Sequence, residues 1–343
     1  MSNMKIFMSF FLCIFFLKAH NQWEQTDFLW NFGLIQQCTK GLNKNPYDFF
    51  STEYSFNKDT YKDISPGNIV WIKSAFLQEF YDQVLATLHV PIVLLIADGD
   101  ESFPSNSNLT IPFEQFINHP FIIHIFAQNN DYTGPSKKVS SLPIGMDFHT
   151  LSYKTNHQDW GHTTSPQEQE TELKNLLKTL KPTNQRKKRA YVDFQFYDTM
   201  HGSFNRYLEC GEDRTLIFEI LLDSGLIDYG PWMKRSDLWE KKSDYAFSIS
   251  PHGNGLDCHR TWEDLLLGCI VIVKTSPLDC LYKGLPVVII NEWSEITEEN
   301  LTTWLTLYGD AFTNPEYRKK LTNAYWFDII RLKSQVSISP SGL

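Results

Sequence analysis

The chain has 343 residues, of which 42% are hydrophobic and 15% aromatic. This length and apolar content suffice for two globular domains of ordinary size, each with its own core. The net charge of −9 argues against a surface for polyanions, because nucleic-acid binding depends on clustered Lys and Arg. We therefore expect a globular protein with no nucleic-acid partner.

The N-terminus carries a short apolar segment. Residues 6–17 are apolar apart from Ser9, and Lys5 and Lys18 flank them. The segment is shorter than the about 20 residues of a membrane span and matches the apolar core of a secretory signal. We predict a signal peptide or signal anchor over residues 1–20, with a buried helix of a cytosolic protein as the alternative. The prediction implies the secretory pathway (ER or Golgi lumen) or export to a periplasm, with membrane association through the N-terminus.

Apolar strands alternate with helices in the first half of the chain. Strands are predicted at residues 68–72, 91–96 and 121–127, and helices at residues 75–88 and 113–117. This alternation indicates a parallel sheet with helices on both faces. We predict an N-terminal Rossmann-like domain over residues 21–165.

A polar segment, residues 166–188, is predicted to cross over to the second half, with a helix near residues 168–180. A basic run at residues 186–189 ends it. We interpret this run as a solvated lead-in to a strand, in preference to a binding patch.

The second half repeats the alternating pattern over residues 189–312. Its predicted elements are strands at residues 191–196, 245–249, 269–273 and 286–290 and a helix near residues 215–224. Residues 313–343 are predicted to form a C-terminal helix and tail, with the helix at residues 315–332. The predicted fold class is therefore α/β, with two Rossmann-like domains facing a cleft, and the ligand site is expected in that cleft.

A glycine-rich loop follows the strand at residues 245–249. Gly253 and Gly255 let the backbone approach a ligand closely, and the helix after them offers free N–H groups to an anion. Arg260 and Glu263 fall on one face of that helix, where they suit a phosphate and sugar hydroxyls. The alternative is an ordinary turn with a solvated ion pair. The residues predicted to bind a nucleotide-sugar are Ser250, His252, Gly253, Asn254, Gly255, Asp257, Arg260 and Glu263.

From Ser250 to Thr297 the chain resembles the donor-binding half of exostosin-like glycosyltransferases. The resemblance rests on the glycine loop and on the later runs Gly268-Cys269-Ile270-Val271-Ile272-Val273, Ser276-Pro277-Leu278-Asp279, Gly284-Leu285-Pro286-Val287 and Trp293-Ser294-Glu295-Ile296-Thr297. It implies a GT-B fold whose C-terminal helix packs back across the cleft. It also implies transfer of a sugar from a nucleotide-sugar donor to a hydroxyl of a glycan, protein or lipid acceptor, with no cofactor.

The resemblance also implies roles for single residues. Glu263 would bind hydroxyls and Arg260 the diphosphate, with Arg206, or alternatively Arg214, as a second basic residue near the diphosphate. Many retaining enzymes of this architecture carry a second glutamate eight residues after the first, where this chain has Val271. Its absence favours an inverting reaction.

An inverting transferase needs a base near the acceptor hydroxyl, and in this architecture the N-terminal domain commonly supplies it. The candidates are Asp98, Asp100, Asp147 and His149. For His149 a purely structural role is the alternative. Asp98 and Asp100 also imitate the metal-binding Asp-x-Asp of GT-A transferases, but we favour a turn or acceptor site and predict no metal ligands. The alternatives for the whole protein are that metal-dependent transferase and a catalytically silent glycan-binding protein of the same fold.

Overall fold

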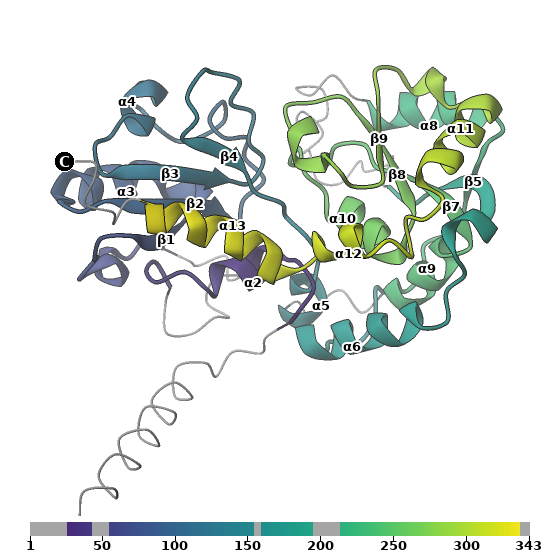
Figure 1. Ribbon diagram of the computed structural model, residues 1–343, viewed down its shortest axis with the longest axis horizontal. Coiled ribbons are helices and arrows are strands. Elements are labelled where there is room, and N and C mark those ends of the chain that lie inside the picture. Colours follow the sequence, from purple (N-terminus) through teal and green to yellow (C-terminus); the bar gives the residue numbers. More distant parts are fainter. Residues whose placement is uncertain (1–25, 43–54, 154–158, 195–212, 337–343) are drawn as a thin grey trace, which may run out of the picture.

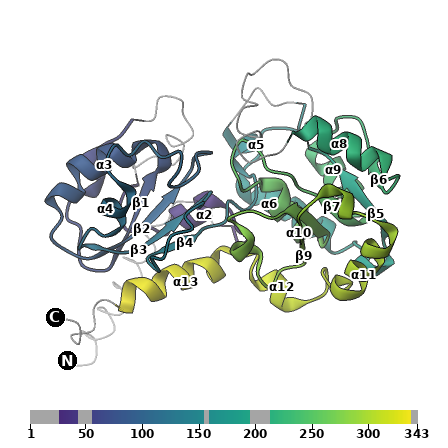
Figure 2. The ribbon, with the colours of Figure 1, turned by 90° about the horizontal axis from the view of Figure 1, so that it is seen from above.

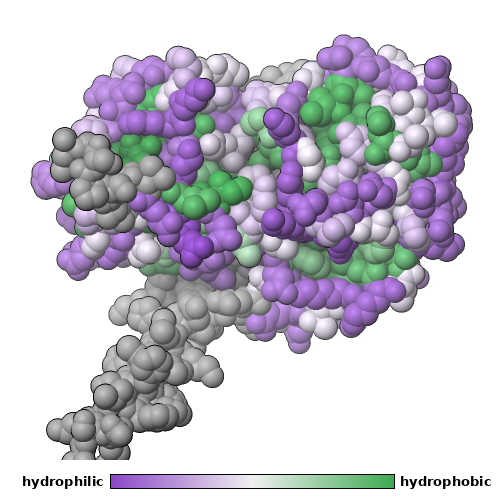
Figure 3. Space-filling view, viewed as in Figure 1, coloured by the Kyte–Doolittle hydropathy of each residue, from purple (hydrophilic) through white to green (hydrophobic). Residues whose placement is uncertain are grey.

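The computed structural model describes residues 26–42, 55–153, 159–194 and 213–336. They form two α/β lobes that stand side by side (Figure 1). The lobes carry mostly hydrophilic residues on the face shown in Figure 3, with apolar patches between them. Among the described residues no helix combines the length and the apolar character needed to cross a bilayer. The predicted signal segment lies outside the described residues, so the signal and the exported location stay predictions, and Arg206 also lies outside them.

The first lobe is built on a parallel sheet in the order β1-β2-β3-β4. The strands are β1 (Asn68–Lys73), β2 (Ile92–Ala97), β3 (Ile122–Ala127) and β4 (Val139–Ser141). One face packs against α3 (Leu77–Gln83) and α4 (Phe113–Ile117), and the other against α2 (Asn31–Ile35) and α13 (Asn323–Val336), as Figure 2 shows. Because both faces are covered, the strands are almost wholly apolar.

The second lobe is a five-stranded parallel sheet in the order β6-β5-β7-β8-β9. The strands are β5 (Lys187–Val192), β6 (Ile227–Tyr229), β7 (Tyr245–Ile249), β8 (Ile270–Lys274) and β9 (Val287–Ile290). The helices around it are α8 (Arg214–Asp223), α9 (Arg235–Lys242), α10 (His259–Leu267) and α11 (Glu298–Tyr308). The chain order reverses at β5, which pairs with β6 on one side and β7 on the other. A ligand is expected at the carboxyl ends of the strands beside such a reversal.

The two sheets confirm the expected fold class of two Rossmann-like domains facing a cleft. One apolar cluster runs through both lobes and includes Trp71 and Phe148 from the first and Trp262 and Val271 from the second. The remaining short elements are α5 (His149–Tyr153), α6 (Pro166–Leu177), α12 (Pro315–Lys319) and 3₁₀ turns at Lys58–Tyr61, Ser74–Phe76, Leu85–Thr87, Thr183–Gln185, Asp279–Tyr282 and Trp293–Glu295.

The single helix predicted at residues 315–332 is wrong, because the chain is interrupted between α12 and α13. The backbone oxygen of Leu321 accepts a hydrogen bond from the N–H of Leu29 (2.9 Å). The side chain of Asn323 donates to the carbonyl of Phe28 (2.8 Å). These contacts with the N-terminal segment replace helical hydrogen bonds, and they turn α13 onto the sheet of the first lobe.

The solvated lead-in predicted at residues 186–189 is confirmed only in part, because Lys187 is exposed but Arg186 is buried. Strand β5 already begins at Lys187, and Arg186 is buried with its guanidinium 5.2 Å from the centroid of the Phe312 ring. Arg189 forms an ion pair with Asp228 at 2.8 Å. Lys187, Lys188 and Arg189 are therefore part of β5, and Arg186 packs directly before it.

A candidate active site between the two domains

A cleft of about 880 Å³ lies between the lobes and receives residues from both. The first lobe lines it with residues that follow its strands and with the start of α5. The second lobe lines it with the glycine loop, the first turns of α8 and α10, and the segment after β6. The predicted residues in its lining are Asp98, Asp100, Asp147, His149, Gly253, Asn254, Gly255, Asp257, Arg260 and Glu263.

The glycine loop joins β7 to α10 and is closed by a hydrogen bond from the N–H of Gly253 to the carbonyl of Gly255 (2.9 Å). A Cβ on Gly255 would lie 2.7 Å from the amide nitrogen of Asn129 in the other lobe. A Cβ on Gly253 would lie 2.9 Å from the sulfur of Cys258. Neither glycine has a positive φ, so tight packing within the protein is what requires them here.

Three of the predicted donor residues shape this loop. Ser250 and His252 are buried away from the cleft lining, and the imidazole Nδ1 of His252 lies 2.8 Å from the carbonyl of Leu256. Asp257 lines the cleft, but its carboxylate accepts hydrogen bonds from the indole N–H of Trp262 (2.9 Å) and the backbone N–H of Ile144 (2.8 Å). Burial raises the pKa of Asp257 to about 7. We infer that Ser250 and His252 hold the loop within its own lobe and that Asp257 fixes it against the first lobe.

Arg260 is held by Asp193, which follows β5. Its Nε lies 2.7 Å from one carboxylate oxygen of Asp193, and Nζ of Lys242 lies 2.6 Å from the other. Lys242 also pairs with Asp264, and both are buried. Burial alone would raise the pKa of Asp193, but Lys242 and Arg260 hold that pKa below its ordinary value. The carboxylate therefore stays charged and fixes the Arg260 side chain.

A second guanidinium stands beside the loop, from Arg214 at the start of α8. Its Nε and Nη2 donate to the carbonyl of His252 at 2.9 and 2.7 Å. The guanidinium carbons of Arg214 and Arg260 each lie 5.8 Å from the centroid of the Phe194 ring. Two guanidinium groups thus meet at one aromatic ring in the cleft, where their N–H groups can bind a diphosphate.

Glu263 and Arg260 have different partners, so the alternative of a solvated pair between them is wrong. One oxygen of Glu263 lies 2.9 Å from Nη2 of Arg235, and the other accepts from the indole N–H of Trp239 (3.1 Å). Arg235 is buried, donates to the backbone oxygen of Asp147, and also donates to the Gln169 side chain (2.8 Å). Arg235 therefore ties α10 to the other wall of the cleft.

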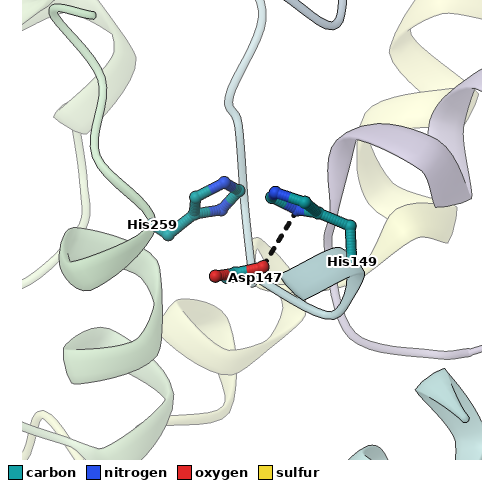
Figure 4. Close-up of side chains that lie close together, drawn as sticks. All are labelled: Asp147, His149 and His259. Carbon is teal, nitrogen blue, oxygen red and sulfur yellow. Dashed lines mark ion pairs between the residues drawn. The ribbon is translucent and has the colours of Figure 1, made fainter. Parts of the chain in front are cut away.

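A carboxylate and an imidazole on that wall face a second imidazole from α10 (Figure 4). Nδ1 of His149 lies 2.9 Å from Oδ1 of Asp147, which also accepts from the N–H of Thr150 (2.9 Å). His259, from α10, reaches across with its Nδ1 2.8 Å from the carbonyl of Gly145. Burial alone would raise the pKa of Asp147, but His149, His259 and Arg235 hold it well below its usual range.

Asp98 directly follows β2 and has a φ of 68°, as the predicted turn requires. Its carboxylate lies 3.0 Å from Nζ of Lys73, so one carboxylate of the Asp-x-Asp pair faces an ammonium group. A Cβ on Gly99 would run into Ser74, which explains the glycine between the two acids. Asp98 and Asp100 line the cleft on the same wall as Asp147.

Sequence reasoning missed four residues of this site: Asp193, Arg214 as a principal residue, Arg235 and His259. On α10, His259 lies away from the face of Arg260 and Glu263, and there it meets residues of the other lobe. A polar residue at the first position of a helix that opens onto a cleft was the available signal.

No protein-family model matches the chain, and no curated protein matches its sequence. Among solved structures it is similar to α,α-trehalose 6-phosphate synthase from Burkholderia multivorans, at 11% identity over 85% of this chain and 78% of that chain, with a TM-score of 0.39. It is also similar to sucrose-phosphate synthase from Thermosynechococcus elongatus, at 10% identity over 77% and 71% of the two chains, with a TM-score of 0.38. The catalytic domain of starch synthase IV from Arabidopsis thaliana gives 13% identity over 78% and 72%, with a TM-score of 0.34. Similarity at this level adds nothing to the assignment of function, which has to rest on the site.

Proposed function

We propose that this protein is a glycosyltransferase that moves a sugar from a nucleotide-sugar donor to an acceptor hydroxyl, with inversion and without a metal ion in the transfer step. The observation that carries the proposal is the pair of guanidinium groups at the glycine loop, which shares one cleft with the Asp147–His149 pair. The guanidinium groups can stabilise a diphosphate leaving group, and the Asp147–His149 pair can take the proton of an attacking hydroxyl.

In this proposal Arg214 and Arg260 bind the diphosphate, and His149 is the general base. Nδ1 of His149 faces Asp147, so Nε2 is the nitrogen that takes the proton of the acceptor hydroxyl. The acceptor oxygen bonds to the anomeric carbon, and the bond from that carbon to the diphosphate breaks with its electron pair on the leaving nucleotide. Because nucleophile and leaving group are held on opposite walls, the sugar carbon inverts.

The contacts of Glu263 do not fit the role in binding hydroxyls that the family resemblance implies, because both its oxygens already have protein partners. We assign it to positioning Arg235, which in turn holds the backbone at Asp147. The acceptor is assigned to the wall of Asp98, Asp100 and Asp147, where carboxylates can accept hydrogen bonds from hydroxyls.

Donor binding tests the first half of the proposal. Calorimetric titration with UDP, GDP, CMP and their sugars should find one nucleotide that binds, and Arg214→Met and Arg260→Met should each weaken it roughly 10- to 100-fold, the value of a hydrogen bond to a charged group. Arg331→Met is the matched control, because Arg331 is exposed on α13 and pairs with Asp328. Unchanged affinity in both cleft variants would refute the donor site.

Turnover tests the second half. His149→Ala should lower kcat by about 10²- to 10⁴-fold, the usual contribution of a general base, while nucleotide affinity stays at the wild-type value. A glycan-binding protein without activity would show neither transfer nor slow donor hydrolysis in any variant. A metal-dependent enzyme using Asp98 and Asp100 would lose its activity with a chelator, whereas the proposed enzyme keeps it.

A further inference from the structure

We infer that Asp147, His149 and His259 together form a binding site for a zinc-type divalent cation, and that the bound cation blocks transfer. The binding itself is independent of the function proposed above. The inhibition rests on that function, because it requires His149 to be the base.

The three side chains converge on one point of the cleft (Figure 4). One donor atom from each lies within 4.8 Å of the others, and the His149–Asp147 pair is already at 2.9 Å. Bonds of about 2.0–2.2 Å to zinc place neighbouring donor atoms roughly 3–3.5 Å apart. The His149–Asp147 pair already has about this spacing, and a movement of the His259 ring toward it completes the geometry. His149 and His259 come from opposite lobes, and their ring centroids are 5.2 Å apart.

The surroundings of the three donors resemble those of established metal ligands. Nδ1 of His259 lies 2.8 Å from the backbone carbonyl of Gly145, so Nδ1 carries the hydrogen and Nε2 keeps its lone pair. The Oδ1 of Asp147 accepts from the N–H of Thr150, which fixes the carboxylate. Hydrogen bonds of this kind orient ligand side chains and strengthen metal binding.

The cation is selected by the ligand types. Two imidazoles with one carboxylate favour Zn²⁺, Co²⁺, Ni²⁺ and Cu²⁺ over Mg²⁺ and Ca²⁺, which prefer oxygen ligands. Asp147 and Glu263 bring two negative charges to this place and Arg235 one positive charge, so the surroundings attract a cation. Three protein ligands in an open cleft leave a coordination position for water or for a hydroxyl of the acceptor.

A bound cation changes what His149 can do. Nδ1 is the nitrogen of His149 that faces Asp147, so Nδ1 binds the cation and the hydrogen of the ring moves to Nε2. His149 then has no lone pair left to accept the proton of the acceptor hydroxyl. Micromolar Zn²⁺ should therefore reduce transfer at least tenfold, and a chelator should restore it, whereas Mg²⁺ should have no effect.

Metal binding is tested on the 343-residue chain after a chelator has removed bound metal. The protein is titrated with Co²⁺, whose visible absorption reports its ligands. A second titration, with Zn²⁺, is followed by calorimetry. We expect one cation per chain and at least a tenfold loss of affinity in His259→Ala and in His149→Gln. His89→Ala is the control, since His89 is exposed at the amino end of β2, away from the cleft. Thermal unfolding shows whether each variant is folded, and either of the two cleft variants alone is sufficient for the comparison.

Two results would overturn the site: no stoichiometric binding of Co²⁺ or Zn²⁺, or equal affinity in the wild type and in the folded cleft variants. Nucleotide affinity, measured on the same metal-free protein, separates this outcome from a failure of the proposed function. A protein that binds zinc but no nucleotide would refute only the transferase. Zinc binding without any inhibition of a measured transfer would refute only the inhibitory role.

Discussion

Replacing Lys242 by methionine should destabilise the second lobe more than any change at an exposed lysine. Nζ of Lys242 sits between the carboxylates of Asp193 and Asp264, and its side chain is only 1% exposed. Methionine fills nearly the same volume without the charge. The change therefore isolates the electrostatic contribution of the ammonium group from that of packing.

The size of the loss in stability follows from the carboxylates that Lys242→Met leaves without their ammonium partner. Removing one partner of a buried ion pair costs about 3–5 kcal/mol, because the other charge is left without compensation. Asp264 is wholly buried, and burial already raises its pKa to about 6 even though Lys242 lowers it. Without Lys242 that pKa rises further. A carboxyl whose folded pKa lies above its unfolded value stabilises the fold at low pH and loses this contribution as the pH rises.

The loss in Lys242→Met should therefore be about 3 kcal/mol or more at pH 8 and clearly smaller at pH 5. Urea unfolding at both pH values, followed by fluorescence, measures it. Lys241→Met is the matched control, because Lys241 is the exposed neighbour on α9. A difference of less than about 0.5 kcal/mol between the two variants at pH 8, or a loss that does not depend on pH, would refute the reasoning.

Three further predictions concern other parts of the fold. Burial lowers the pKa of His124 to about 4, which is below its unfolded value of about 6.5. The protein should therefore lose up to about 3 kcal/mol of stability as the pH falls from 7 to 4. His124→Gln should remove this part of the pH dependence of urea unfolding. In urea unfolding, Gly268→Ala should lower the free energy of unfolding more than Gly225→Ala does. Both glycines have a positive φ, in which a side chain costs about 1–2 kcal/mol, but only at Gly268 would a Cβ also lie 2.6 Å from the Phe312 side chain. Val271→Glu places a carboxyl on a fully buried position of β8 and should lower the thermal midpoint by many degrees, and a midpoint within two or so degrees of wild type would contradict the packing of this strand.

The long strands could be predicted because both faces of each sheet are buried. In β2 and β7 every residue is buried, and the apolar runs are visible in the sequence. The short strands β4 and β6 were missed. The sequences Val139-Ser140-Ser141 and Ile227-Asp228-Tyr229 have no apolar run, and only their pairing with β3 and β5 makes them strands.

Helices α9 and α11 were missed for different reasons. Helix α9 has no side-chain cap at its start and only one large apolar residue with a buried side chain, Trp239. Helix α11 did carry a signal, because the hydroxyl of Thr297 accepts from the N–H of Asn300 and two glutamates follow the cap. This capping pattern indicates a helix more strongly than the weak apolar periodicity of the segment argues against one.

In the site, the position of the donor loop was predictable and the roles of its side chains were not. Strand, glycines and helix occur in local order, so the loop between β7 and α10 could be located from the sequence. Whether Ser250, His252 and Asp257 face the cleft or the interior depends on the backbone path of the loop. The meeting of His259 with Asp147 depends on the packing of two lobes, for which no local spacing exists.

The position of α13 imposes an order on how the chain can mature. This helix is synthesised after the whole second lobe, yet it covers a face of the first sheet, where Ile330 joins the same cluster as Trp71 and Leu95. Domains generally fold in the order of their synthesis. Here part of one face of the first sheet, beside α2, stays uncovered until the second lobe and α13 have been made. The newly made first lobe is therefore incomplete and keeps apolar surface in water until then.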